Sequence, residues 1–480
     1  MAVIAGWLVP HPPLIFPEVG RGKQNEINDT VTAYRAAADS IAKAAPDTIV
    51  IISPHAPMYA DYFHIAPGAG DSGDMKAFGV PGVKIQATYD TEFIEELARG
   101  CAAAGFPAGT EGAKKKGLDH GASIPVRFIN DAYNPKDTTQ KEPSPLCPCP
   151  KYVITGVSGL PLADHYRFGV LISETAERLG RKTVVIASGD LSHRLKDEGP
   201  YGFSPEGPEY DKLIRAIGAD ADFSRLFDMD EGFLENAGEC GHRPLTVLAG
   251  ALDRKAIAAK PLSYEGPFGV GYCLASFTVS AASGTDEGRA FLDAYLDSEQ
   301  KRAEERIQNE SPHVNLARRT VENFVRTGRL YQSPEPLDDA LASGRAGVFV
   351  SIKKQGQLRG CIGTISPVTE SIGEEIRSNA VSAASRDPRF DIIGEDELPY
   401  LEYSVDVLAP AEDIDSEDEL DPAKYGVIVS LGGKRGLLLP DLEGIDDAGT
   451  QVSIAMRKAG IRESDRQRVK LERFEVIRYR

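Results

Sequence analysis

The sequence has too few cysteines and too few cations for several classes of protein. Six cysteines scattered over 480 residues are too sparse for a disulfide scaffold, which favours a reducing compartment. The 54 Lys and Arg residues are outnumbered by 72 Asp and Glu residues. The resulting net charge of −18 opposes binding to a nucleic-acid backbone or to an anionic membrane surface. We therefore expect neither a nucleic acid nor a membrane as a partner.

Long hydrophobic runs are also absent. No stretch approaches the roughly 20 consecutive apolar residues that a membrane helix needs. The opening sequence, MAVIAGWLVPHPPL, lacks a basic segment and reaches proline too early for a signal peptide, so we expect a cytoplasmic protein. Composition is that of a soluble globular chain, with 41% hydrophobic and 26% charged residues. The length argues for more than one core, because single cores seldom exceed about 250–300 residues.

Short apolar runs alternate with helix-like stretches in the first half of the chain. Four runs are rich in Val, Ile and Ala and lack the strict alternation of a half-exposed strand: residues 1–10, 47–54, 151–160 and 182–189. This pattern favours strands that are buried on both faces of a largely parallel sheet. The stretches between them, such as residues 30–45 and 92–105, predict helices. The first half is therefore predicted to be an α/β domain with a mostly parallel central sheet.

Two segments interrupt this pattern. Residues 131–150 are polar and proline-rich and are predicted to be an excursion from the first domain. Their Cys147 and Cys149 are spaced closely enough to bind a metal, and the alternative is a surface loop without a specific role. The second break, at residues 281–288, is small and acidic, and we place the domain boundary there. The predicted domains are residues 1–281 and 289–480.

The second half is patterned differently. A long charged helix is predicted over residues 291–308, and the strand-like runs that follow alternate polar with apolar residues. These runs are residues 346–354, 401–410, 425–433 and 435–440. Alternation of this kind is typical of strands with one solvated face. We therefore predict a separate α+β domain with an antiparallel sheet.

Three histidines follow predicted buried strands almost immediately. They are His11, His55 and His193, and Asp190 precedes the third. Loops at the carboxyl ends of parallel strands form the ligand crevice of α/β sheets, so these side chains are expected to converge on one site. Prolines beside His11 and His55 stiffen the backbone there. A lone histidine after a strand would be an ordinary loop residue, but three in the same topological position favour a metal site.

A mononuclear metal site with open positions needs a further ligand, and a carboxylate suits non-haem Fe(II). The segment NAGECGHRPLTVLAGAL, residues 236–252, places Glu239 and Cys240 at the start of an apolar helix. Glu239 is a hard ligand that suits Fe(II), whereas Cys240 is a soft ligand that suits copper or zinc. Alternatively, Glu239 is an acid favoured at a helix start by the helix dipole. The predicted ligands are His11, His55 and Glu239, with Cys240 as the alternative to Glu239.

An ordered set of segments carries a family resemblance over roughly residues 1–281. The set comprises His11, His55, LDHGASIP around His120, SGDLSH ending in His193, and ECGHRP. Together they resemble the class III extradiol dioxygenase superfamily, which includes the LigB-like and Memo-like proteins. The resemblance implies that two His and one Glu bind Fe(II). The Memo branch has a Cys in the ECG loop and an Asp that matches Asp190.

The resemblance also implies a reaction, which is ring opening of a catecholic or phenolic compound. His193 would act as an acid or base, with a pKa near the working pH. His120 would hydrogen-bond the substrate or oxygen, or alternatively would cap the turn in which it lies. The predicted catalytic residues are therefore His193, His120 and Asp190.

From about residue 289 the chain resembles the AMMECR family. The resemblance is carried by LRGCIGT at residues 358–364, by ASRDPRFDII at residues 384–393 and by LEYSVDVLAPAEDI at residues 401–414. Ser385 departs from the family, which usually has an aromatic residue at that point. Arg359 and Cys361 form a candidate second site, because an adjacent Arg lowers the pKa of a thiol. The alternative is a tight turn with a buried cysteine.

The two resemblances together imply a fusion of components of the AmmeMemoRadiSam system. The expected partner is then a radical S-adenosylmethionine protein, and the expected substrate is a small aromatic molecule. Three hypotheses follow. The first is an Fe(II)-dependent oxidoreductase related to extradiol dioxygenases; the second is a Memo-like metal protein or binding module that does not open rings; the third is a redox step on an intermediate from the radical protein. Glu239 favours the first hypothesis, and Cys240 favours the others.

Overall fold

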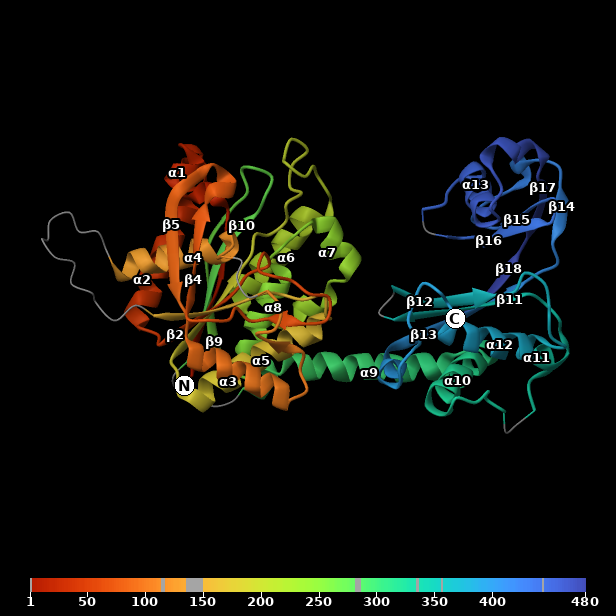
Figure 1. Cartoon of the computed structure of the whole chain (residues 1–480), viewed down its shortest axis with the longest axis horizontal. Coiled ribbons are helices and arrows are strands. Elements are labelled where there is room, and N and C mark those ends of the chain that lie inside the picture. The colour runs from red at the N-terminus through yellow and green to blue at the C-terminus, as the bar shows by residue number, and fades with distance from the viewer. Residues whose placement is uncertain are drawn as a thin grey trace, which may run out of the picture. The chain divides into compact units, whose positions relative to one another are not determined.

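The computed structural model describes residues 2–113, 117–134, 150–280, 286–333, 336–354, 357–442 and 444–480. The chain forms two compact units, Met1–Asp297 and Ser298–Arg480 (Figure 1). Helix α9 (Phe291–Asn309) contains the division between them. Cys147 and Cys149, which the sequence marked as a close pair, lie outside the described residues.

The N-terminal unit is built on one six-stranded sheet with the order β7-β2-β8-β1-β10-β9. The strands are β7 (Lys151–Thr155), β2 (Thr48–Ile52), β8 (Thr183–Ser188), β1 (Val3–Val9), β10 (Tyr272–Val279) and β9 (Ile257–Glu265). The first four strands are parallel, and β10 and β9 extend the sheet in antiparallel fashion. The predicted α/β domain with a mostly parallel sheet is thereby confirmed.

Helices cover this sheet on both faces. Every residue of β2 and β8 is therefore buried. The helices are α1 (Pro17–Gly20), α2 (Asn28–Ala44), α3 (Thr91–Ala103), α4 (His120–Tyr133), α5 (Leu162–Leu179), α6 (Glu206–Asp220), α7 (Glu231–Ala237) and α8 (His242–Ala251). Helix α2 packs against α4, and α5 packs against α8. A continuous Val/Ile run has no solvated side, so the strand can be stable only between two such layers.

Smaller strands surround the sheet without joining it. They are the pair β3 (Phe63–His64) and β6 (Ala108–Gly109), and the hairpin of β4 (Gly70–Met75) and β5 (Val80–Thr88). The sequence did not predict the hairpin, because the segment GDSGDM of β4 carries no strand-like apolar pattern. Backbone pairing with β5 holds β4 in place instead.

The C-terminal unit contains two antiparallel sheets, which confirms the predicted α+β class. The first is β12 (Gln357–Gly363), β11 (Val348–Lys354), β13 (Leu401–Leu408) and β18 (Val476–Tyr479), in that order. The second is β14 (Glu412–Ile414), β17 (Lys470–Phe474), β15 (Gly426–Leu431) and β16 (Lys434–Leu438). The helices are α10 (Pro312–Thr327), α11 (Asp339–Ser343), α12 (Ile372–Ser385) and α13 (Ala448–Lys458).

The first sheet of this unit has two differently used faces. Val348, Val350 and Ile352 of β11 are fully buried in the core that includes α10 and α12. Phe349 points to the opposite face and packs with Ile428 of the second sheet. The alternation of β11 therefore places helices on one face and the second sheet on the other.

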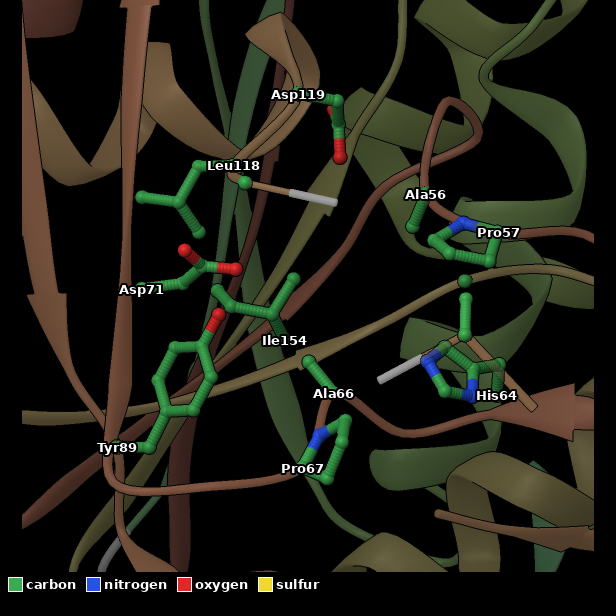
Figure 2. A pocket seen from close by; sticks show the side chains of 13 residues that line it. Ala56, Pro57, His64, Ala66, Pro67, Asp71, Tyr89, Leu118, Asp119 and Ile154 are labelled. Carbon is green, nitrogen blue, oxygen red and sulfur yellow. The ribbon is translucent and has the colours of Figure 1, made fainter. Parts of the chain in front are cut away.

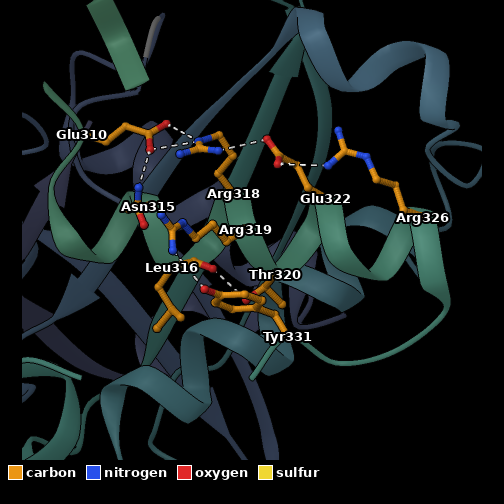
Figure 3. A network of polar contacts seen from close by, with 9 residues as sticks. All are labelled: Glu310, Asn315, Leu316, Arg318, Arg319, Thr320, Glu322, Arg326 and Tyr331. Atoms are coloured by element: carbon orange, nitrogen blue, oxygen red, sulfur yellow. Dashed lines mark hydrogen bonds and ion pairs between the residues drawn. The ribbon is translucent and has the colours of Figure 1, made fainter. Parts of the chain in front are cut away.

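Charged side chains form a row of ion pairs along α10 (Figure 3). Arg318 lies between Glu310, at 2.9 Å, and Glu322, at 3.0 Å. Glu322 also pairs with Arg326 at 3.4 Å. Residues four apart on a helix are neighbours on its surface, so two of these pairs follow directly from the sequence. In the described parts of the chain, no helix is both long and apolar enough to span a membrane.

Candidate metal centre

Three neighbouring strands of the N-terminal sheet end at the same edge. Strands β2, β8 and β1 are adjacent, and their last residues align, with Val9 opposite Ser188 and Ile52 opposite Ala187. The loops that follow carry His11 after β1, His55 after β2 and Asp190 after β8. Parallel strands bring their carboxyl ends together, so side chains far apart in the sequence meet here.

Three imidazoles form a histidine cluster at this edge: His11, His55 and His120. The Nε2 atoms of His11 and His55 are 3.0 Å apart, and one ligand atom from each of the three rings lies within 4.8 Å of the others. The rings of His55 and His120 stack with centroids 4.2 Å apart. The three histidines together could bind a single metal ion. The sequence did not single out His120 as a ligand.

A hydroxyl group behind the cluster sets the tautomer of His11. The Ser188 hydroxyl donates to the Gly121 carbonyl at 2.6 Å, which uses its single proton. Its oxygen therefore accepts from Nδ1–H of His11 at 3.0 Å. With the proton on Nδ1, the lone pair of Nε2 faces His55 and is free to bind a metal. A hydrogen bond of this kind is what usually orients a ligating histidine.

The first turn of α4 approaches His11 closely, and this approach requires a glycine. A Cβ on Gly121 would lie 2.5 Å from Oγ of Ser53 and 3.4 Å from Nδ1 of His11. Asp119 caps α4 by accepting from the Ala122 N–H, and it also accepts from the Ser53 hydroxyl at 2.6 Å. The cap fixes the start of α4 and therefore the position of His120.

Burial keeps these imidazoles neutral. Burial lowers the pKa of His11 well below 6.5, and the neighbouring rings of His55, His120 and His193 lower it further. Burial and then repulsion from His55 lower the pKa of His120 to about 4. The pKa of His55 is also lowered by burial, against the opposing charge of Asp119. Neutral imidazole is the form that binds metal, so the cluster is ready for a cation at neutral pH.

The loop before α8 touches the loop after β8. A Cβ on Gly189 would lie 2.2 Å from the Cα of Gly241, so glycine is required at this contact. The contact brings Cys240 to the cluster, with its Sγ 3.5 Å from Nε2 of His11. The Asp190 N–H donates to the same sulfur at 3.3 Å. Burial raises the pKa of the Cys240 thiol well above 9, and a bound cation would reverse this shift.

Glu239, the neighbouring residue, is engaged at the helix start. Its Oε2 accepts from the His242 N–H at 2.6 Å and from the Tyr210 hydroxyl at 3.4 Å. Burial raises its pKa to about 7, although the His242 N–H partly offsets this effect. The carboxylate thus satisfies the first turn of α8, as the helix-start alternative described.

Asp190 and His193 lie in the loop after β8. Oδ1 of the buried Asp190 accepts from the backbone N–H of His11 at 2.7 Å, and burial raises its pKa to about 7. His193 is half-buried, and burial followed by repulsion from His55 lowers its pKa to about 4. His193 is therefore near the cluster but outside the group of three.

Exposed aromatic rings flank the cluster on two sides. The Phe78 ring lies 5.4 Å from the His120 ring and is 38% exposed. The Tyr201 ring lies 5.3 Å from the His193 ring and is 63% exposed. Two partly exposed aromatic side chains thus lie beside histidines of this site.

A small pocket adjoins the cluster (Figure 2). Ala56 and Asp119, which are next to His55 and His120 in the sequence, belong to its wall. The wall combines apolar side chains such as Ile154 with Asp71 and the phenol of Tyr89. His64 also lines the pocket, whereas His11, His55 and His120 do not, so the pocket lies beside the histidine cluster and does not enclose it.

The candidate second site, Arg359 and Cys361, lies inside strand β12 of the C-terminal unit and not in a turn. Arg359 forms two hydrogen bonds with Glu397, at 2.9 and 3.0 Å. Its guanidinium is therefore committed to that carboxylate. The cation beside Cys361 is instead Arg389, which donates to the Cys361 carbonyl at 3.2 Å.

Comparisons with known proteins match the two units of the chain to two different families. The sequence model of the catalytic LigB subunit of aromatic ring-opening dioxygenases matches residues 5–275, and that of AMMECR1 matches residues 314–479. A protein of Clostridium acetobutylicum is 39% identical over the whole of both chains. A protein of Thermotoga maritima is 48% identical over 36% of this chain and 98% of its own.

Among solved structures, an uncharacterized protein from Escherichia coli K12 is 14% identical with a TM-score of 0.36. It covers 57% of this chain and 99% of its own. An uncharacterized protein from Pyrococcus horikoshii is 29% identical with a TM-score of 0.33, covering 35% and 88%. On the family matches, the chain belongs to the LigB family of aromatic ring-opening dioxygenase subunits and carries an AMMECR1 domain after it.

Proposed function

We propose that the N-terminal unit is a metal-dependent oxidoreductase that acts on a small phenolic or catecholic compound. The observation that carries the proposal is the 3.0 Å approach of the Nε2 atoms of His11 and His55. Two nitrogen ligands that lie about 2.1 Å from one metal at right angles are about 3.0 Å apart. The Ser188 hydrogen bond supports it, because that bond leaves the His11 lone pair free.

The third ligand would come from the loop of Glu239 and Cys240, and the contacts favour Cys240. A sulfur at about 2.3 Å and a nitrogen at about 2.1 Å from the same metal are about 3.1 Å apart at a right angle and about 3.6 Å apart in tetrahedral geometry. Sγ of Cys240 is 3.5 Å from Nε2 of His11. The Glu239 carboxylate, by contrast, is already bonded to the start of α8. His120 would take a further position or contact the substrate.

A metal held there would polarise the substrate's phenolic oxygens and provide a path for electrons. Residues of this chain take the remaining roles, which are proton transfer, positioning of the ligands and contact with the substrate. His193, which is neutral at working pH, accepts or returns the phenolic proton. Asp190 fixes the His11 backbone, and the rings of Phe78 and Tyr201 receive the aromatic ring. Fe(II) is the metal expected from the family, and zinc or copper are the alternatives.

A second candidate function is favoured by the position of Cys240. Thiolate is a soft ligand that selects copper or zinc and is oxidised readily, so it suits ring-opening chemistry poorly. The unit would then be a Memo-like metal protein that acts with a radical S-adenosylmethionine partner, or a binding module.

The test compares Glu239→Gln with Cys240→Ser in protein purified without oxygen. Bound iron, copper and zinc are measured per chain, and turnover of a catechol panel is measured in parallel. Loss of iron and turnover in Glu239→Gln alone would support the dioxygenase. Loss of metal in Cys240→Ser alone, without turnover of any catechol by the parent protein, would overturn the dioxygenase and support the second candidate.

A further inference from the structure

Two buried side chains in the wall of the pocket beside the histidine cluster have unused hydrogen-bonding atoms. His64 and Tyr89 both line the pocket and are only 2% and 4% exposed. Nδ1–H of His64 donates to the Glu111 carbonyl at 3.0 Å, so the lone pair of its Nε2 remains available. Among the described residues, neither that Nε2 atom nor the Tyr89 hydroxyl has a partner. Because buried polar groups are normally paired, these two atoms point to a ligand.

Two carboxylates make the same pocket negative. Oδ1 of Asp71 accepts from the Ser72 N–H at 2.8 Å, and Oδ1 of Asp119 accepts from the Ser53 hydroxyl at 2.6 Å. The second oxygen of each carboxylate has no hydrogen-bond or ion-pair partner in the part of the chain that the structure describes. No Lys or Arg is among the described residues of the wall. A concave site lined by charges of one sign favours a ligand of the opposite sign, here a cation.

The Tyr89 hydroxyl and the Asp71 carboxylate offer two acceptors to the same guest. Figure 2 shows the hydroxyl directed toward Asp71, beside the apolar side chain of Ile154. No hydrogen bond joins the two groups, so a donor placed between them could bond to both. Ala66 and Pro67 add to the apolar part of the wall. Apolar neighbours exclude water from such a contact and thereby strengthen it.

The spacing of the side chains argues against a bare metal ion as the occupant. Among the described residues, only His11, His55 and His120 come close enough together to hold one. The centre of a water-sized group has about 30 Å³ of free space in the pocket, which is room for about two such groups. A primary ammonium and its methylene carbon have that size. The ammonium has three N–H donors, for which carboxylate, phenol and imidazole are all acceptors.

We propose that the pocket binds a primary ammonium group at the end of a short arm on the aromatic substrate. We call it the ammonium pocket, formed by His64, Asp71, Tyr89 and Asp119. Its role rests on the proposed function, because the ring of the substrate would then lie at the histidine cluster. Asp119 directly precedes His120 and Ala56 directly follows His55, so the arm passes from the cluster straight into the pocket. The substrate class is therefore a phenol or catechol with an aminoalkyl substituent.

Ethylammonium chloride tests the pocket without any turnover. The full chain is isotopically labelled in its histidine rings for nuclear magnetic resonance, and His64→Gln identifies the His64 signal. Ethylammonium should shift this signal saturably. Sodium chloride at equal ionic strength should not, nor should tetramethylammonium, which is larger and has no N–H. Asp71→Asn should weaken binding about tenfold, because a hydrogen bond between charged groups is lost. Asp74→Asn removes an exposed carboxylate of the same strand that does not line the pocket, and it should leave binding unchanged.

Three phenols of similar size test the connection to the substrate. Tyramine, para-propylphenol and hydroxyphenylpropionate have a positive, a neutral and a negative arm, and calorimetry measures their binding to the metal-loaded chain. Tyramine should bind at least about tenfold more tightly than para-propylphenol, and the propionate should bind most weakly. Tyr89→Phe should reduce this preference about three- to tenfold, because one acceptor is lost while the ring remains.

The outcomes separate the ammonium pocket from the proposed function. The ammonium pocket is overturned by the absence of a saturable ethylammonium shift, by equal effects of Asp71→Asn and Asp74→Asn, or by tyramine that binds no better than para-propylphenol. A saturable, Asp71-dependent ethylammonium shift without binding of any phenol would support the pocket as an ammonium site and overturn the proposed function.

Discussion

The histidine cluster of the N-terminal unit and the surroundings of Cys361 in the C-terminal unit differ in whether their polar side chains are neutral or charged. In the N-terminal unit, three imidazoles crowd together, and burial keeps them neutral although the charge of Asp119 is near His55 and His120. In the C-terminal unit, side chains around Cys361 are charged and mostly paired, as in Asp387 with Arg389 and Glu397 with Arg359. A set of neutral donors suits a cation that arrives later, whereas charges that are paired with one another stabilise the fold at those positions. The predictions below test this contrast.

The largest effect is expected from the exposed member of the histidine cluster. His55→Ala should reduce bound metal at least about tenfold, because one imidazole ligand is lost and the partly exposed side chain is not needed for folding.

His193→Ala should leave metal content near that of the parent protein while abolishing turnover. Metal analysis of both variants checks this, and loss of metal in His193→Ala would make His193 a ligand.

A smaller effect is expected from the hydroxyl behind His11. Ser188→Ala should weaken metal binding about 10–100-fold, because the Nδ1 proton of His11 then loses its acceptor. Competition with a chelator of known affinity measures the change. Ser192→Ala is the matched control, since Ser192 is equally buried and donates to the Ala237 carbonyl instead. Equal affinities in the two variants would show that the tautomer of His11 does not matter.

In the C-terminal unit the corresponding test is a pH dependence. Burial raises the pKa of Glu397, but the hydrogen bonds and charges of Arg359 and Lys354 outweigh it and lower the pKa to about 2. A lowered carboxyl pKa contributes stability above the unfolded value, near 4.5, and this contribution is lost as the pH falls toward 2. Glu397→Gln should therefore lower the free energy of unfolding by about 1–3 kcal/mol at pH 6, and by progressively less below pH 4.5.

Urea unfolding followed by far-UV circular dichroism measures this difference. Trp7, the single tryptophan, lies in the N-terminal unit, so its fluorescence transition should not move. Glu395→Gln removes an exposed carboxylate two residues away and should have little effect at any pH. A difference between Glu397→Gln and the parent protein that is constant from pH 6 to pH 3 would contradict the role given to the ion pairs.

Local patterns in the sequence were sufficient for much of the fold. Continuous Val/Ile runs predicted β1, β2, β7 and β8, because a strand without a polar face must be buried on both sides. Alternating runs predicted the antiparallel strands of the second unit for the converse reason. Strand β4 and the location of Cys361 within β12 were not predictable in this way. Both depend on pairing with the neighbouring strand of a hairpin, β5 for β4 and β11 for β12, and not on an apolar pattern in their own residues.

The features of the candidate metal centre also fall into those that the sequence determines and those that tertiary packing determines. The sequence by itself determined which strand ends carry histidine, since each follows its strand within a few residues. Only the tertiary structure decided that β2, β8 and β1 are neighbours, because strand order depends on packing across the whole sheet. It also decided that the sulfur of Cys240, and not the carboxylate of Glu239, lies beside His11. Adjacent side chains at a helix start point in directions about 100° apart, and the contact of Gly189 with Gly241 selects which of them faces the cluster.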